Sequence, residues 1–166
     1  MRGRTSAKSS RRRGSEMVEG ALAILPLLAV LFGVVDLAVA VFVQNMAQFA
    51  VRQGVRYAIT SQTMTGMGQD ASIKTVVQDY TMGFLNSLSS DGVGADTISI
   101  TYYNPVTLLP VTGVGSNIGG NIVVVSATGL SWAWMVPLLR SAAPLTFSVS
   151  SADIMEATPL AGAPAR

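Results

Sequence analysis

The residues whose types and spacing could take part in chemistry surround the bond between Gly14 and Ser15. Arginines occupy positions 11–13, and Glu19 is the fifth residue after Gly14. Cleavage of this bond would leave an α-amine on Ser15, which can pair with Glu19 of a neighbouring copy. An unpaired charge in hydrocarbon costs about 2.5–3.5 kcal/mol or more, so such a pair would fix the register of packed helices. A simpler interpretation is that Glu19 stabilises a helix N-terminus.

The composition excludes most catalytic chemistry. The 166 residues include no cysteine and no histidine, which removes thiol nucleophiles, disulfides, hydrolytic triads and the usual zinc sites. Hydrophobic residues make up 49% of the chain and charged residues only 12%, which is atypical of a cytosolic domain. The sequence predicts a protein that is not an enzyme, with no cofactor, no metal site and no small-molecule substrate.

The charge of the chain changes sign at the bond after Gly14. Six of the eleven basic residues lie before it and no acid does; they are Arg2, Arg4, Lys8, Arg11, Arg12 and Arg13. Removal of residues 1–14 leaves five basic against nine acidic side chains, so the formal charge falls from +2 to −4. A basic segment beside a membrane helix orients that helix with the basic end in the cytoplasm. We prefer this role for the leader, residues 1–14, to nucleic-acid binding.

Residues 20–43 have the length and composition of a transmembrane segment. They contain no basic residue and one acid, Asp36, and about 20 apolar residues span a bilayer. A secretory signal peptide cleaved after Ala40 is an alternative, but its apolar core would be shorter. The pattern after Val43 stays helical, with small and apolar residues at three- and four-residue spacings. We therefore expect one helix over residues 15–60, which Pro26 should kink.

Asp36 is an unusual residue within this apolar segment. A carboxylate there is costly unless it is protonated, paired or turned toward protein. One interpretation places it near enough to the outer interface for water to reach it. The other is a buried contact with a second subunit or another membrane protein, in which Asp36 contributes to assembly.

The remainder of the chain predicts a small α+β domain over residues 70–157, after a linker at 61–69. Asp70 can cap a helix over residues 70–88, and residues 97–102, 121–126 and 145–150 have the patterns of about three antiparallel strands. Residues 158–166 are rich in alanine, glycine and proline and predict a disordered tail.

Two loops of this domain contain residues that could take part in binding. The apolar residues 130–139 contain both tryptophans, so Trp132 and Trp134 are candidates for a core plug, a membrane contact or a partner contact. Gly113 and Gly115 resemble part of a phosphate loop, but the absence of a following lysine argues strongly against a nucleotide site.

The segment 11–60 resembles the TadE-like minor pilins, or pseudopilins, of the bacterial tight-adherence (Flp-type) pilus system. The resemblance rests on the Gly14 to Glu19 spacing, the apolar run with Pro26, the Gly33-Val34-Val35-Asp36 step, and residues 50–58, which are similar to an Ala-Arg-x-Gly-x-Arg-Tyr-Ala stretch. Gly20 departs from the pattern, because a bulky residue usually follows the glutamate. Val39 departs too, where relatives often have a basic residue.

The resemblance implies a structural subunit of an adhesive secretion system. Its expected partners are a prepilin peptidase, other pilin subunits, inner-membrane platform proteins and the lipid bilayer. The resemblance also implies a single pass through the inner membrane, with an extracytoplasmic C-terminal domain. Two alternatives remain open: an anchored protein that is never cleaved, and a domain secreted after cleavage at Ala40.

Overall fold

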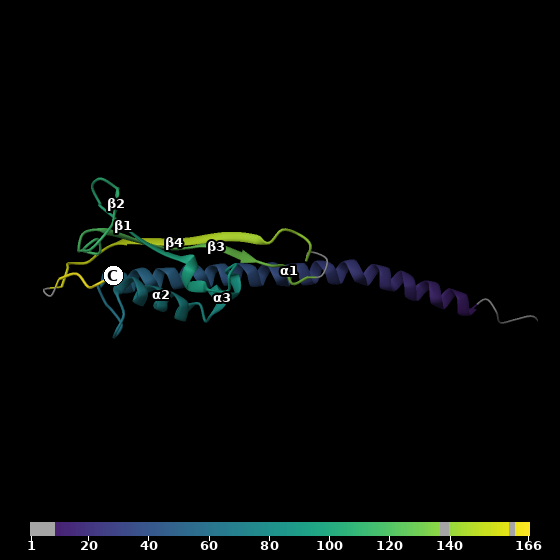
Figure 1. Cartoon of the computed structure of the whole chain (residues 1–166). Coiled ribbons are helices and arrows are strands. Elements are labelled where there is room, and N and C mark those ends of the chain that lie inside the picture. The colour runs from purple at the N-terminus through teal and green to yellow at the C-terminus, as the bar shows by residue number, and fades with distance from the viewer. Residues whose placement is uncertain (1–8, 137–139, 160–161) are drawn as a thin grey trace, which may run out of the picture. The chain divides into compact units, whose positions relative to one another are not determined.

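A computed structural model of the chain describes residues 9–136, 140–159 and 162–166, with side chains from Gly14 onward. The predicted α+β class is confirmed: a long helix is followed by a small domain of short helices and antiparallel strands (Figure 1). The chain divides into two compact units, which are described separately. One comprises Met1–Val39 with Trp134–Ala142, and the other comprises Ala40–Ala133 with Ala143–Arg166.

The long helix α1 extends over Ser9–Ile59 and contributes to both units. It begins before Gly14, so it is longer at its N-terminus than the predicted helix over residues 15–60. Pro26 lies inside α1 without interrupting it; the kink expected there stays a prediction. The other leader residues, 1–8, lie outside the described part of the chain.

The sheet of the second unit has four antiparallel strands in the order β2-β1-β3-β4. Their bounds are β1 Ile98–Tyr103, β2 Pro110–Val111, β3 Ile122–Trp132 and β4 Leu145–Ile154. The three predicted strands correspond to β1, β3 and β4. The sequence did not predict β2, because two residues are too few for an alternating pattern. Strands β3 and β4 are longer than the predicted strands. The pairing register between them shifts between Ala127 and Leu130, where Gly129 adopts a φ of 70°.

The second half of α1 supplies one wall of the core of this unit. Its buried positions fall at helical spacing and are mostly small: Ala40, Val43, Ala47, Ala50, Val51, Gly54, Val55 and Ala58. Opposite them are buried residues of α2 (Gln69–Tyr80) and of the sheet, which include Ile73, Val77, Val123 and Val125. Small side chains on α1 let the helix backbone approach these elements closely. The pattern after Val43 predicted that the helix continues, and the small and apolar residues that form it are buried, except that Tyr57 is only half-buried.

The helix predicted over residues 70–88 is two helices, because the backbone turns between them. Helix α2 ends at Tyr80, and α3 occupies Phe84–Leu88. Met82 and Gly83 between them adopt φ angles of 51° and 82°, which a continuous helix does not allow. The prediction that Asp70 caps α2 is also wrong: the residue at the cap position is Gly68, and it contributes no side-chain hydrogen bond.

The last residues of the chain, whose composition predicts a disordered tail, make several contacts with the rest of the second unit. The backbone N–H of Gln69 donates to the Ala165 carbonyl over 2.6 Å, and Arg166 forms a 2.8 Å ion pair with Asp70. The Tyr102 hydroxyl donates to the same carboxylate over 2.9 Å, and the Arg166 guanidinium lies 4.8 Å from the centre of the Tyr102 ring. Burial and the nearby Asp70 charge raise the pKa of Tyr102. Asp70 therefore connects the tail to the sheet instead of capping α2.

Among the glycines of α1, Gly54 is the one with the least room for additional volume. A β-carbon there would lie 2.5 Å from Val77 Cγ2 and 3.7 Å from Val125 Cγ1. We expect Gly54→Val to destabilise the second unit by about 1–3 kcal/mol, because overpacking forces neighbouring side chains and backbone apart. Urea unfolding of the full chain in detergent, followed by tryptophan fluorescence, would measure the loss.

Gly20→Val is the matched control, because nothing lies within 4 Å of a β-carbon built on that helical glycine. The smaller Val77→Ala side chain should restore part of the stability of Gly54→Val. Equal urea midpoints for Gly54→Val and the parent would contradict the close packing of α1 on α2.

Candidate functional site

The first half of α1 has an apolar surface that is exposed around its circumference. Between Gly14 and Val35 only Ala29 and Gly33 are even half-buried. The exposed large side chains include Leu22, Ile24, Leu25, Leu27, Leu28, Val30, Leu31, Phe32, Val34 and Val35. A helix that is apolar on all sides is typical of a membrane span or of a helix buried among other subunits.

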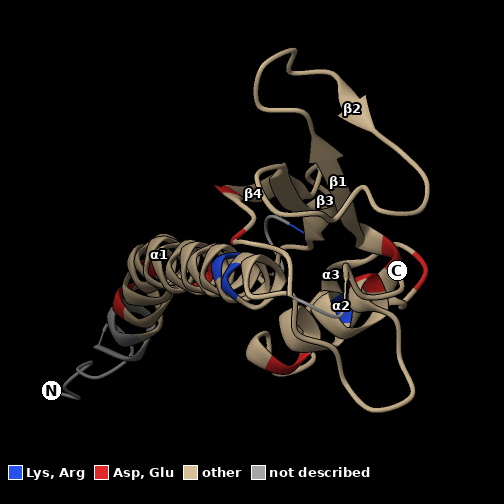
Figure 2. Ribbon diagram, turned by 90° about the vertical axis from the view of Figure 1, so that its left-hand side faces the viewer, with Lys and Arg blue, Asp and Glu red and all other residues tan. Residues whose placement is uncertain are grey.

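The length of α1 is sufficient for a membrane span. Its stretch Gly14–Ile59 is long and apolar enough to cross a bilayer, with a mean hydropathy of 2.6 in its most apolar part. Figure 2 shows the positions of charged residues as a few isolated coloured segments on an α1 ribbon that is otherwise largely uncharged. These features indicate a single-pass membrane anchor, as the sequence predicted.

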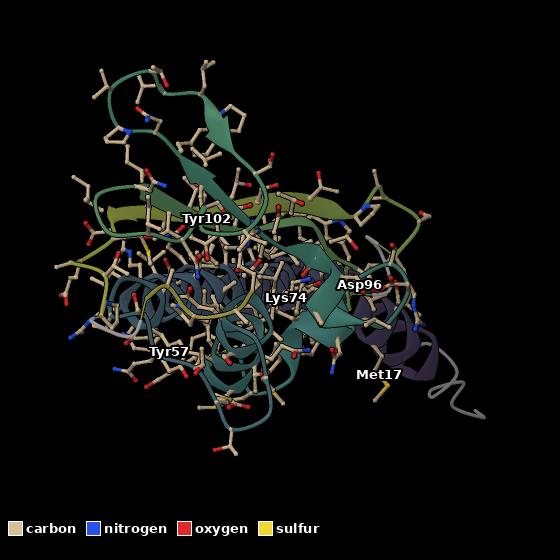
Figure 3. All side chains as sticks on the ribbon, turned by 60° about the vertical axis from the view of Figure 1, so that its left-hand side comes forward. Met17, Tyr57, Lys74, Asp96 and Tyr102 are labelled. Atoms are coloured by element: carbon tan, nitrogen blue, oxygen red, sulfur yellow. The ribbon has the colours of Figure 1, made fainter. Side chains whose placement is uncertain are left out.

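The Gly14–Ser15 bond lies within α1, and both residues are exposed. A β-carbon built on Gly14 would have no neighbour within 4 Å, so no tertiary contact of the described residues restricts access to this glycine. Met17, two residues beyond Ser15, is 78% exposed, and its side chain projects from the helix into open space (Figure 3). A peptidase that hydrolyses this bond would have to open one helical turn, which glycine makes easier by about 1 kcal/mol relative to alanine.

Glu19 lies one turn after Ser15, on the same face of α1. Its side chain is exposed, as is that of Glu16. The side chains of the three preceding arginines lie outside the described residues. The geometry therefore places a carboxylate beside the predicted new N-terminus, on a helix surface that a second subunit could cover.

Asp36 is placed differently from its neighbours on α1. Its side chain is only 2% exposed, whereas Val35 is 51% exposed and Leu37 is 49% exposed. Its Oδ2 accepts hydrogen bonds from the backbone N–H groups of Met135, over 2.8 Å, and Val136, over 3.2 Å. The carboxylate thus has partners within its own chain, an arrangement that the sequence did not predict.

A small crevice lies beside these hydrogen bonds. It has a volume of about 250 Å³ and is lined by Phe32, Val35, Asp36, Met135 and Val136. All of its lining side chains except Asp36 are apolar. The lining residues come from positions about a hundred residues apart, so spacing alone gave no signal that they meet.

The two tryptophans that are candidates for a membrane or partner contact, Trp132 and Trp134, belong to different units. Trp132 is the last residue of β3, whereas Trp134 belongs to the unit that contains Asp36. Both side chains are half-buried. The predicted apolar loop continues to residue 139, but residues 137–139 lie outside the described part of the chain.

Other kinds of site find little support in the described residues. Within them, no group of three His, Cys, Asp or Glu side chains could hold a metal ion. At the glycines that resemble part of a phosphate loop, the Gly113 carbonyl accepts a hydrogen bond from Arg166, so this group already has a partner within the chain.

The family model of TadE-like proteins matches residues 14–56 of the chain. The predicted resemblance is thus confirmed over the part of α1 that begins at Gly14. The match covers about a quarter of the chain and shows what this part of α1 is similar to. A comparison with curated proteins and another with solved structures each found no match.

Proposed function

We propose that the chain is a membrane-anchored minor pilin, or pseudopilin, of a tight-adherence pilus, processed by a prepilin peptidase after Gly14. The observation that carries the proposal is where the family match begins. It starts at Gly14, where the basic leader ends, and covers the whole exposed apolar part of α1. The predicted cleavage site therefore lies at the start of the matched segment, and the predicted membrane span lies within it.

The orientation follows from the charge of the leader. Six basic residues and no acid precede Gly14, and short basic flanks stay on the cytoplasmic side of a membrane. Residues 20–43 then cross the inner membrane, and the second unit, which begins in the last turn of this span at Ala40, continues on the extracytoplasmic side. In this orientation a peptidase acting at the cytoplasmic face reaches the exposed Gly14.

Cleavage would change what the helix can bind. It removes the basic residues and leaves an α-amine on Ser15, so the helix begins with a positive charge one turn before Glu19. In a bundle of such helices, the amine of one subunit pairs with Glu19 of another, and each charge compensates the other in apolar surroundings. Other pilin subunits and inner-membrane platform proteins are the partners in this assembly. Asp36 contributes to assembly less directly, through the segment that its carboxylate holds.

The intact mass of the protein extracted from membranes tests the processing. In cells with a prepilin peptidase, we expect a mass that corresponds to an N-terminus at Ser15. An N-terminus at Met1 would contradict processing and leave an uncleaved anchor. An N-terminus near Val41 would contradict the anchor as well, because the domain would then be secreted.

A pair of glycine substitutions makes this test specific. Gly14→Leu should abolish cleavage, because it places a bulky side chain directly before the bond that the peptidase hydrolyses and hinders access to that bond. Gly20→Leu is the matched control, since both glycines are exposed on α1 with no neighbour within 4 Å of a β-carbon. Cleavage of Gly14→Leu at the rate of the control would overturn the assignment of the bond.

Glu19→Gln tests the assembly role separately from processing. The variant should still have Ser15 as its N-terminus, but its co-precipitation with the other pilin subunits should fall about tenfold or more, because the Ser15 amine loses its counter-charge. Glu16→Gln is the control and should behave like the parent, since Glu16 is also exposed and lies one turn before Glu19. Unchanged co-precipitation of Glu19→Gln would rule out the proposed pair.

A further inference from the structure

The hydrogen bonds of Asp36 lie well inside the span proposed above. Asp36 follows Gly20 by sixteen residues, so it lies about 24 Å along the helix axis from the start of the proposed span. The hydrocarbon core of a bilayer is about 30 Å thick. Asp36 and the segment bonded to it therefore lie inside the outer part of the hydrocarbon, if residues 20–43 span the membrane as proposed above.

In this contact the Asp36 carboxylate and the backbone N–H groups of residues 135 and 136 satisfy each other's hydrogen-bonding requirement. A carboxylate in hydrocarbon needs hydrogen-bond donors, and non-helical backbone at membrane depth needs acceptors for its N–H groups. Asp36 Oδ2 accepts from two consecutive backbone N–H groups, those of Met135 and Val136. An apolar residue at position 36 would leave both N–H groups without this acceptor.

The side chains around the contact are suited to lipid. Val136 is buried, whereas Met135 is 58% exposed next to it. Trp134 directly precedes Met135, and its half-buried ring has the amphipathic character of residues at membrane interfaces. The apolar crevice beside Asp36 is continuous with the exposed surface of Phe32 and Val35 on α1. This is the surface that the proposed span turns toward acyl chains.

We propose that residues 134–136 form a second membrane contact, a short foot embedded in the outer leaflet and held to the transmembrane helix by Asp36. The occupant of the apolar crevice is a lipid acyl chain. Asp36 is a positioning residue: it fixes the foot against α1 through backbone hydrogen bonds, and Trp134 and Met135 contact the lipid. The chain is then attached to the membrane by two segments that lie a hundred residues apart.

Tryptophan fluorescence tests this foot in the full chain. Trp132→Phe leaves Trp134 as the only tryptophan. In phosphatidylcholine vesicles brominated on the acyl chains, Trp134 emission should fall about twofold or more relative to plain vesicles, because the ring lies in the outer leaflet. Aqueous acrylamide should quench it weakly.

Substitutions at Asp36 then test what holds the foot. In the Trp132→Phe background, Asp36→Leu should lose most of the quenching by brominated lipid and gain quenching by acrylamide. Asp36→Asn keeps an oxygen acceptor and should retain the quenching of the parent. Leu37→Ala is the control, because Leu37 is an exposed neighbour on the same turn.

Three results would overturn the proposal. The first is strong acrylamide quenching of Trp134 without quenching by brominated lipid. The second is identical quenching of Asp36→Leu and the parent. The third is protection of Trp134 from both quenchers that is lost when the protein is diluted in additional lipid. This result would mean that a second copy of the chain, and not an acyl chain, covers the crevice.

Resistance of the same samples to alkaline carbonate extraction separates this proposal from the proposed function. An inserted chain whose Trp134 is not in lipid overturns the foot alone. A chain that does not insert overturns both.

Discussion

The exposed apolar surface on the first half of α1 is the constraint on which the rest of the structure depends. From Gly14 to Val35 the described side chains have almost no burial within the chain, and so much apolar surface is unfavourable in water. Lipid or the helices of other subunits must cover it. Helical geometry also satisfies the backbone of this segment internally, which the interior of a bilayer requires. An anchor that can also join a bundle of helices meets both conditions.

The composition of α1 changes where its surroundings change. Large aliphatic side chains dominate up to Leu37, whereas the buried positions after Ala40 are mostly alanine, glycine and valine. Large side chains suit contact with acyl chains, while small ones let α2 and the sheet approach the helix backbone. Gly54 is the extreme case, since a β-carbon there would meet Val77. The same helix thus serves as an anchor in its first half and as a core element in its second half.

Periodicity and spacing predicted the parts of the molecule that depend on local sequence. The apolar span, the continuation of its helix after Val43 and the strands β1, β3 and β4 all have patterns that repeat within a few residues. The misses involve contacts distant in sequence: Asp36 with Met135 and Val136, and Asp70 with Tyr102 and Arg166. The break between α2 and α3 was missed because its apolar stripe continues across Met82 and Gly83, although their backbone turns. Composition also gave no signal of the contacts that Ala165 and Arg166 make with α2 and Tyr102.

The claim that the first half of α1 lies in the membrane is tested most directly by measuring the environment of each position along this helix. Because the natural chain has no cysteine, single cysteines from position 16 to position 44 can carry nitroxide labels in lipid vesicles. The accessibility of the labels to oxygen and to a water-soluble nickel complex would then be measured by electron paramagnetic resonance. We predict high oxygen and low nickel accessibility on all faces of the helix from Gly20 to Val35, with protection at Asp36. Nickel accessibility throughout this range would contradict the claim that the first half of α1 lies in the membrane.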